Sequence, residues 1–465
     1  KAGTFLHILV WIAFLIPLGI FLGWMNKRWP MINGSGIPQV RGAIILKMNL
    51  SWWLELPMKL LSAVIAIGLG LSLGREGPSI QIGAYVGNAV HSVFRRPAVE
   101  RKILLTSGAA AGLAAAFNAP LAGVLFVVEE LHKHFTVRMV ACAMGASLAG
   151  YTVVSAIFGL APIFSFEMIE PLSVSYIPAV ILLGAAAAVV GHLFKLAMYR
   201  AQDLYPAAKI PAILRPVIPL LITIPIGLFT VDLIGSGHHL IQILGEMEAS
   251  IALLIGMLAI KILFSALSYG SGVAGGIFLP LLACGAILGK IWGVSMESLG
   301  YIDASMHLNF IIFGMAAFFT SVVKTPITGS VLILEMSGNF SHFSELVAGC
   351  LTAYVVSELL RSRAVYDVFL ERMLRSNPAV YRPVHGDKVI VEVPVSLTSG
   401  LLHRSVNDVP WPEGTLIVGI ERGETELIPD GKTEIEPGDR LLVMVTDETV
   451  DEVRGSLLAM GGVDA

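Results

Sequence analysis

Apolar residues follow one another in long segments through most of the chain, and short polar stretches separate these segments. We expect helices at 5–25, 55–72, 78–94, 104–117, 121–135, 137–158, 174–200, 213–232, 250–268, 277–293, 308–322, 327–337 and 343–360, then an amphipathic, arginine-rich helix at 363–375. Many of these segments are shorter than the roughly 20 residues that a helix needs to span a bilayer. Short segments interrupted by glycine and proline are typical of discontinuous helices around a buried site. The pattern predicts an all-α polytopic membrane protein with broken helices.

The pattern changes at residue 387, where apolar and polar residues begin to alternate. This alternation predicts strands at 389–395, 415–420 and 440–445 and a closing helix at 447–460. We therefore divide the chain into a transmembrane domain at 1–375, a linker at 376–386 and a small α/β domain at 387–465.

Charge divides the chain at the same place. Residues 387–465 carry 16 acidic and 6 basic residues, and removing these from the totals of 34 and 31 leaves 18 acidic and 25 basic residues in 1–386. A basic membrane part favours anions over cations in any aqueous vestibule. By the positive-inside rule, the basic clusters near 95–102, 132–138 and 361–375 mark the cytoplasmic face. We expect the acidic C-terminal domain in the cytoplasm, below a bacterial plasma membrane.

Composition supports a membrane protein and excludes other classes. Hydrophobic residues make up 55% of the chain and charged residues 14%, which is far from the average of soluble globular proteins. The three cysteines lie in separate apolar segments, so we expect neither a disulfide framework nor a cysteine metal cluster. The histidines show no metal-ligand spacing, and we expect no metal, no cofactor, no enzymatic activity and no nucleic-acid partner.

Three motifs of the first half recur in the second half, in the same order. The stretch Gly34-Ser35-Gly36 recurs 201 residues later, Pro78 to Gly87 recurs 202 residues later, and Pro120 to Glu129 recurs 206 residues later. Three motifs at nearly constant spacing predict a duplication, with repeats at about 5–170 and 174–375. In transporters such repeats usually enclose the transport site between them.

Residues 72–84 form the most unusual stretch, because a charged pair interrupts a long apolar region. Gly74-Arg75-Glu76-Gly77-Pro78 reads as a tight turn that opens a helix, with Pro78 at the first helical position. The free N–H groups of that helix start would form an anion site beside the Glu76 carboxylate. Ionisable residues inside membranes are usually functional, although a structural Arg75–Glu76 pair in a loop is an alternative.

The two repeats differ where the first carries ionisable residues. Glu76 corresponds to Phe278, which lies 202 residues later, and Glu130 corresponds to Met336, which lies 206 residues later. The first repeat therefore holds the ionisable machinery.

The motifs resemble those of a known family. Gly34-Ser35-Gly36-Ile37-Pro38, Gly74-Arg75-Glu76-Gly77-Pro78 and Gly276-Ile277-Phe278-Leu279-Pro280 resemble the three signature motifs of CLC chloride channels and transporters, in the family's order. This resemblance covers about residues 1–375. Residues 387–465 resemble the TrkA-C regulatory domain of potassium-uptake and related transport proteins, which implies a small ligand of unknown identity.

The resemblance implies a homodimer in membrane lipid, with one pathway per subunit, that exchanges chloride for protons. Chloride would be bound as substrate by the Ser35 hydroxyl, the backbone N–H groups of Ile277 and Phe278, and the Tyr366 phenol. Hydroxyl and amide donors suit an anion that must also leave, since they carry no full positive charge.

The resemblance also assigns two carboxylates. Glu76 would be the gating glutamate, which competes for the anion site when ionised and leaves it when protonated. Glu130 would be the internal proton-transfer glutamate of the exchanger branch, because channel members usually lack an acid there. The chain departs from the family at Arg41, where many exchangers have an acid, and in having one apolar segment rather than two before Ser35.

Alternative interpretations remain open at this stage. After the chloride/proton exchanger, the second interpretation is a passive voltage- or pH-gated chloride channel of the same architecture. The third is a potassium-transport component, which only the C-terminal domain indicates. For single residues, Glu129 and Glu130 could cap a helix end against Lys133 and Arg138, and Tyr366 could be an interfacial anchor. Both Ser35 and Ser236 could be plain turn residues.

Overall fold

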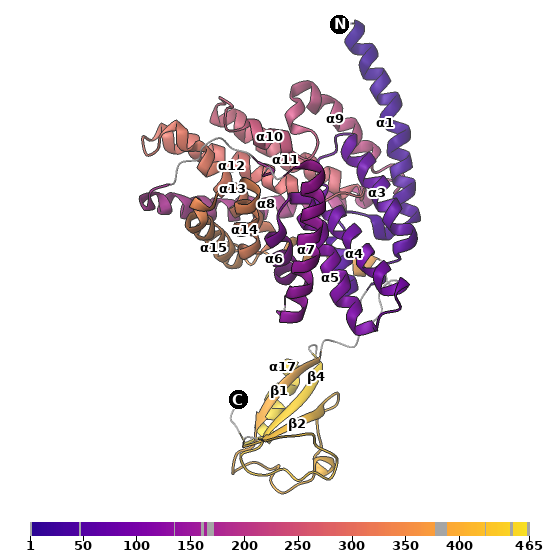
Figure 1. Cartoon of the computed structure of the whole chain (residues 1–465), viewed down its shortest axis with the longest axis vertical. Coiled ribbons are helices and arrows are strands. Elements are labelled where there is room, and N and C mark those ends of the chain that lie inside the picture. Colours follow the sequence, from indigo (N-terminus) through magenta and orange to yellow (C-terminus); the bar gives the residue numbers. More distant parts are fainter. Residues whose placement is uncertain are drawn as a thin grey trace. The chain divides into compact units, whose positions relative to one another are not determined.

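The computed structural model divides into two units, residues 1–380 and residues 381–465 (Figure 1). The apolar segments form the helices of the first unit. The structure describes residues 2–45, 48–133, 135–159, 162–164, 172–376, 388–423, 425–446 and 450–462. Each unit has a hydrophobic core of its own. Residues 377–386 of the expected linker lie outside the described residues.

The helices of the first unit are α1 (Ala2–Arg28), η1 (Pro30–Ile32), α2 (Ile37–Ile44), α3 (Trp52–Gly68), α4 (Glu76–Val93), α5 (Ala98–Phe117), α6 (Pro120–Phe126), η2 (Val127–His132), α7 (Val137–Phe158), η3 (Val174–Tyr176), α8 (Ile177–Ala207), α9 (Val217–Phe229), η4 (Val231–Leu233), α10 (His238–Ile243), α11 (Ile251–Gly270), α12 (Phe278–Ser298), η5 (Ala304–Met306), α13 (His307–Val323), α14 (Pro326–Ser337), η6 (Phe340–His342), α15 (Phe343–Leu359) and α16 (Val365–Ser376). In the described part of the chain, six are long and apolar enough to cross a membrane, and others are short, so the prediction of a polytopic protein with broken helices is confirmed.

Several helix limits differ from expectation, and helices α2 and α10 are additional. Helix α8 continues to Ala207, although a polar connection was expected from residue 200. The segment expected as one helix at 121–135 is α6 followed by the π-helix η2. Helix α4 begins at Glu76, so Pro78 is its third residue rather than its first. Proline is tolerated there because the N–H groups of a first helical turn have no intrahelical acceptor.

The internal repeat is visible in the packing. Helices α4, α5 and α7 lie side by side (Figure 1). Helix α4 crosses α5 so closely that a Cβ on Gly83 would collide with the backbone of Gly108. Helix α12 crosses α13 in the same way, because a Cβ on Gly285 would lie 2.5 Å from the carbonyl oxygen of Gly314. The corresponding helices of the two halves therefore pack alike.

Two glutamates join the halves by capping each other's helices. The Glu129 carboxylate, just beyond α6, accepts hydrogen bonds from the N–H groups of Ile327 at 3.2 Å and Thr328 at 2.8 Å, which begin α14. The Glu335 carboxylate, near the end of α14, accepts from the N–H groups of Leu121 at 3.0 Å and Ala122 at 2.7 Å, which begin α6. The two helices are thus antiparallel neighbours, and each supplies the anion that the other's N-terminus favours.

The second unit is a four-stranded antiparallel sheet with one helix. Its elements are β1 (Lys388–Pro394), η7 (Val406–Asp408), β2 (Leu416–Arg422), β3 (Thr425–Leu427), β4 (Arg440–Thr446) and α17 (Val450–Met460), and the strand order is β1-β4-β2-β3. Helix α17 packs against β1 and β4 and buries Leu457. The expected small α/β fold is confirmed, with β3 as an additional strand. Residues 447–449 of the expected helix lie outside the described residues.

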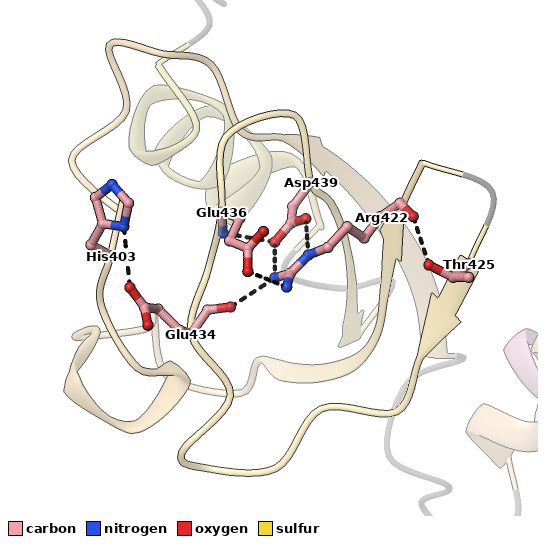
Figure 2. Close-up of polar contacts among 6 residues, drawn as sticks. All are labelled: His403, Arg422, Thr425, Glu434, Glu436 and Asp439. Carbon is pink, nitrogen blue, oxygen red and sulfur yellow. Dashed lines mark hydrogen bonds and ion pairs between the residues drawn. The ribbon is translucent and has the colours of Figure 1, made fainter.

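Arg422 ties the turns of this sheet together (Figure 2). Its guanidinium donates two hydrogen bonds of 2.8 Å to the buried Asp439 carboxylate, one to Glu436 and one to the carbonyl oxygen of Glu434. Asp439 also accepts from the N–H of Glu436 at 2.8 Å. The hydrogen bonds of this cluster all lie within the domain, and we assign it a structural role.

We predict that the reciprocal caps stabilise the first unit. Glu335→Gln removes the charge and leaves one amide oxygen for two N–H donors, so the free energy of unfolding should fall by about 1 kcal/mol. Glu129→Gln should cost a similar amount, while Glu246→Gln, which changes an exposed acid, should cost little. Thermal unfolding in detergent measures all three, and equal melting temperatures for the wild type and Glu335→Gln would contradict this account.

Candidate functional site

Three glycine-rich loops meet inside the first unit and pair through their backbones. Gly74 and Gly276 donate to each other's carbonyl oxygens at 2.7 Å. The N–H of Gly275 donates to the carbonyl oxygen of Gly34 at 3.0 Å, and Gly34 donates to Val273 at 3.1 Å. Helices α2, α4 and α12 begin within a few residues of these pairs. The starts of three helices, each with N–H groups that lack an intrahelical acceptor, therefore converge on one junction.

Ser35 lies fully buried in the first of these loops. Its hydroxyl oxygen accepts a hydrogen bond from the N–H of Ile37 at 3.3 Å, and the Tyr269 phenol lies beside it. Helix α4 begins close by, because a Cβ on Gly77 would lie 2.6 Å from the carbonyl oxygen of Ser35. Gly36 has a φ of 95°, a conformation that glycine adopts readily. The turn thus fixes the Ser35 side chain at the junction.

Glu76 is the first residue of α4, and only 1% of its surface is exposed. Its carboxylate folds back toward Gly74 and lies near the N–H groups of Arg75, Glu76 and Leu279, the last of which belongs to α12. One of its oxygens, Oε2, is buried without a well-formed hydrogen bond in the described structure. Arg75 lies exposed and donates a hydrogen bond of 3.4 Å to the carbonyl oxygen of Ala116. Glu76 therefore lies buried among the N–H donors of two helix starts.

Ile277 and Phe278 form the start of α12, directly after Gly276 of the Gly74–Gly276 pair. Both are fully buried. The Phe278 ring packs against three other rings, with centroid distances of 4.9 Å to Phe117, 6.1 Å to Phe126 and 4.5 Å to Phe319. The side chain of Phe278 is thus a packing group, and its backbone N–H is what this residue offers to the junction.

Tyr366 lies in the first turn of α16 and is completely buried. In the described structure its hydroxyl has no hydrogen-bond partner. The phenol lies close enough to Tyr269, Glu130 and Glu76 to interact with them electrostatically. An interfacial anchor keeps its hydroxyl at the membrane surface, so complete burial excludes that alternative. A buried phenol without a partner is costly and points to a group that the hydroxyl serves.

Glu130 lies apart from the junction, in the π-helix η2, with 2% of its side chain exposed. Its carboxylate is 3.6 Å from the Arg41 guanidinium, which also contacts Asp367. Lys133 pairs with the same Asp367 at 2.8 Å. The neighbouring Glu129 caps the start of α14 and does not pair with Lys133 or Arg138. Glu129 therefore acts as a helix cap, as the alternative proposed, but at another helix, whereas Glu130 caps no helix in the described structure.

Two cavities lead toward these groups. One, of about 760 Å³, is lined by residues that include Glu130, Lys133, Lys324, Arg363 and Asp367. The other, of about 660 Å³, reaches Gly34 and Tyr269 and is lined by Arg215, Arg372, Arg375 and Asp203, among others. Excess positive charge around the second cavity would raise the local concentration of small anions.

The structure thus brings Ser35, Glu76, Ile277 and Phe278 together, sets Tyr366 within electrostatic range of Glu76, and leaves Glu130 beside a separate cavity. Two buried lysines, one at this junction and one at the corresponding turn of the second half, were not predicted from the sequence. Lys59 donates to the carbonyl oxygens of Ile32 at 2.8 Å and Gly34 at 2.7 Å. Lys261 makes the same contacts 202 residues later, with Leu233 at 3.1 Å and Gly235 at 2.8 Å. The repeat spacing was the signal that could have found them.

Within the described residues, no three histidine, cysteine or acidic side chains are grouped to hold a metal ion. Cys142, Cys284 and Cys350 are free thiols.

Comparison with known proteins agrees with this geometry. A family model described as "Voltage gated chloride channel" matches residues 18–358, and one described as "TrkA-C domain" matches residues 390–457. The H(+)/Cl(-) exchange transporter ClcA of Citrobacter koseri is 34% identical over 391 residues, or 80% of this chain and 81% of that protein. The ClcA of Salmonella paratyphi B is 35% identical over 380 residues, or 79% of each chain.

A solved structure of similar fold is that of a slow cyanobacterial Cl⁻/H⁺ antiporter, with a TM-score of 0.76 and 29% identity over 80% of this chain and 88% of that one. The family match covers more than half of the chain, and the relatives are matched over most of their length. The chain is therefore a multi-pass integral membrane protein that belongs to the voltage-gated chloride channel family, the CLC proteins, whose signature motifs resemble those around Ser35, Glu76 and Phe278.

Proposed function

We propose that this protein exchanges chloride for protons across the bacterial plasma membrane. The observation that carries this proposal is the Glu76 carboxylate, which lies buried among the N–H groups of two helix starts, beside a junction that also holds Ser35. A titratable acid among anion-binding donors couples the two ions, because a carboxylate and a chloride compete for the same donors. The relatives that match four-fifths of the chain are exchange transporters.

Chloride, the transported substrate, would be bound by the Ser35 hydroxyl, the N–H groups of Ile277 and Phe278, and the Tyr366 phenol. The buried Tyr366 hydroxyl without a partner supports this set, since an anion would satisfy it. The first N–H groups of α12 likewise lack intrahelical acceptors. All four donors belong to neutral groups, so they can bind an anion without holding it permanently.

Glu76 would be the gate. When ionised, its carboxylate takes the donors that chloride would use, and when protonated it leaves them. The position of its Oε2 near the N–H of Leu279, without a well-formed hydrogen bond, supports a group that can exchange places with an anion.

Glu130 would pass protons between the cytoplasm and Glu76. It lies off the junction and lines the cavity of about 760 Å³, which gives it a route to water. The presence of an acidic residue at position 130 favours an exchanger over a passive chloride channel, because a channel would need no internal proton acceptor. The potassium-transport alternative loses support because residues 18–358, most of the transmembrane part, match the chloride family.

The transmembrane domain would span 1–375, the linker 376–386 and the cytoplasmic regulatory domain 387–465. The division of the structure between residues 380 and 381 falls inside that linker. A homodimer in membrane lipid follows from the family, and α7 offers an exposed apolar face with Leu148, Val153 and Ile157 that lipid or a second copy would cover. The C-terminal domain would bind a small ligand, as its TrkA-C match suggests.

We predict different effects for the two carboxylates. Glu76→Gln leaves a neutral isostere, like a permanently protonated gate, so chloride should move without proton coupling and without pH dependence. Glu130→Gln removes the internal relay, so chloride should still move while proton transport falls by about 100-fold or more. Reconstituted liposomes with simultaneous chloride and pH recording measure both fluxes.

The control for this pair is Glu358→Gln, because Glu358 lines the same cavity as Glu130 but pairs with Lys324 at 2.6 Å. It should keep its proton coupling. If Glu130→Gln pumps protons as the wild type does, Glu130 is not the relay.

We predict that Tyr366→Phe weakens chloride binding by about tenfold, since a hydrogen bond to a charged group contributes about 1.5–3 kcal/mol. The variant should be no less stable than the wild type in chloride-free buffer, because it loses a buried hydroxyl without a partner. Tyr199→Phe is the control, since the Tyr199 hydroxyl is also buried without a partner but belongs to α8 and packs beside Arg372. Titration calorimetry with chloride compares the three proteins, and unchanged affinity in Tyr366→Phe would remove Tyr366 from the ligand set.

A further inference from the structure

Four charged side chains from three elements meet beside the proposed proton relay. Arg41 belongs to α2 and Asp367 to α16. Glu130 lies in η2, and Lys133 directly follows that helix. The Arg41 guanidinium contacts Asp367 and lies 3.6 Å from Glu130, and Lys133 lies 2.8 Å from Asp367. Two positive charges thus face two negative ones when both acids are ionised.

Each of these three elements also carries, or directly follows, a residue of the proposed transport site. Helix α2 begins just after Ser35, α16 carries Tyr366 next to Asp367, and η2 carries Glu130 itself. Helix α2 packs directly against both η2 and α16. Arg41 touches both carboxylates of the cluster and therefore joins the proton relay to the helix that carries the phenol.

Burial makes this contact consequential. The side chains of Glu130 and Arg41 are only 2% and 15% exposed, so water screens their attraction weakly. The other charges that act on Glu130 are Glu129, which also lies in η2, and Lys133, which follows η2 directly and is 44% exposed. Arg41 is the better shielded of the two cations that face the relay.

We propose that Arg41 is a positioning residue for proton transfer at Glu130: it holds the Glu130 carboxylate in place and supplies the charge against which Glu130 releases its proton. This inference rests on the proposed exchange of chloride for protons. It assigns a role to a position where the family resemblance leads one to expect an acid.

The central test compares Arg41→Gln with Asp367→Asn. Both variants lose the Arg41–Asp367 contact and should lose similar thermal stability. Arg41→Gln also deprives Glu130 of its partner, so proton flux relative to chloride flux should fall about tenfold, since an opposite charge at this distance commonly changes a carboxyl group's proton affinity by that factor or more. Asp367→Asn leaves Arg41 to Glu130 and should keep the flux ratio within about twofold of the wild type.

Arg363→Gln is the matched control, because Arg363 lines the same cavity but pairs with Glu371. It removes a positive charge without touching Glu130 and should leave the flux ratio unchanged. If Arg41→Gln does not fold, Arg41→Lys serves instead. A lysine keeps the positive charge, but its single ammonium group cannot contact both carboxylates as the planar guanidinium does. The ratio of proton flux to chloride flux should therefore fall about threefold.

The outcomes separate this inference from the function on which it rests. Equal losses of coupling in Arg41→Gln and Asp367→Asn would mean that Arg41 only clamps two helices, and would overturn the inference. Wild-type coupling in Arg41→Gln, or in Arg41→Lys if that is the variant measured, would also overturn it. If the wild type itself moves no protons, the proposed exchange fails first. Proton and chloride fluxes in the same liposomes decide among these results.

Discussion

The two hydrogen bonds that Gly74 and Gly276 exchange are the constraint on which the rest of the transmembrane unit depends. Irregular backbone inside a membrane is tolerated only where protein satisfies its polar groups. Here loops from the two halves satisfy each other, and the paired glycines let them approach closely. The helices that follow then begin at one point with unused N–H groups, so the fold creates an anion site as a result of solving its own hydrogen-bonding problem.

Several buried lysines and glutamates follow the same logic, because backbone groups bind their side chains. Lys59 binds carbonyl oxygens of the turn that precedes Ser35, which offsets their negative charge beside the place that would receive an anion. Lys261 binds the carbonyl oxygens of the corresponding turn, before Ser236. Glu129 and Glu335 bind helix starts on opposite halves. Glu76 is the exception, since one of its oxygens lacks a well-formed hydrogen bond.

Much of this arrangement was predictable from local patterns. The apolar segments gave helix positions such as Val137–Phe158, and the glycine-rich motifs located the three loops. The contacts of Arg41 were not predictable, because its partner Asp367 lies far away in the sequence and no periodicity links them. The repeat spacing could have paired Lys59 with Lys261, but not shown that both bind carbonyl oxygens. The assignment of Tyr366 rested on loose similarity, whereas its complete burial without a partner is a property of the fold.

The central claim is that movements of chloride and protons are linked in one protein, and one measurement tests it directly. Purified wild-type protein in liposomes is given an outward chloride gradient, with no pH gradient and with the membrane potential clamped, and the internal pH is recorded. The account predicts that protons move into the liposomes as chloride leaves, and that an imposed pH gradient drives chloride in the same coupled manner. Chloride efflux with no change in internal pH would contradict the account and identify a passive channel.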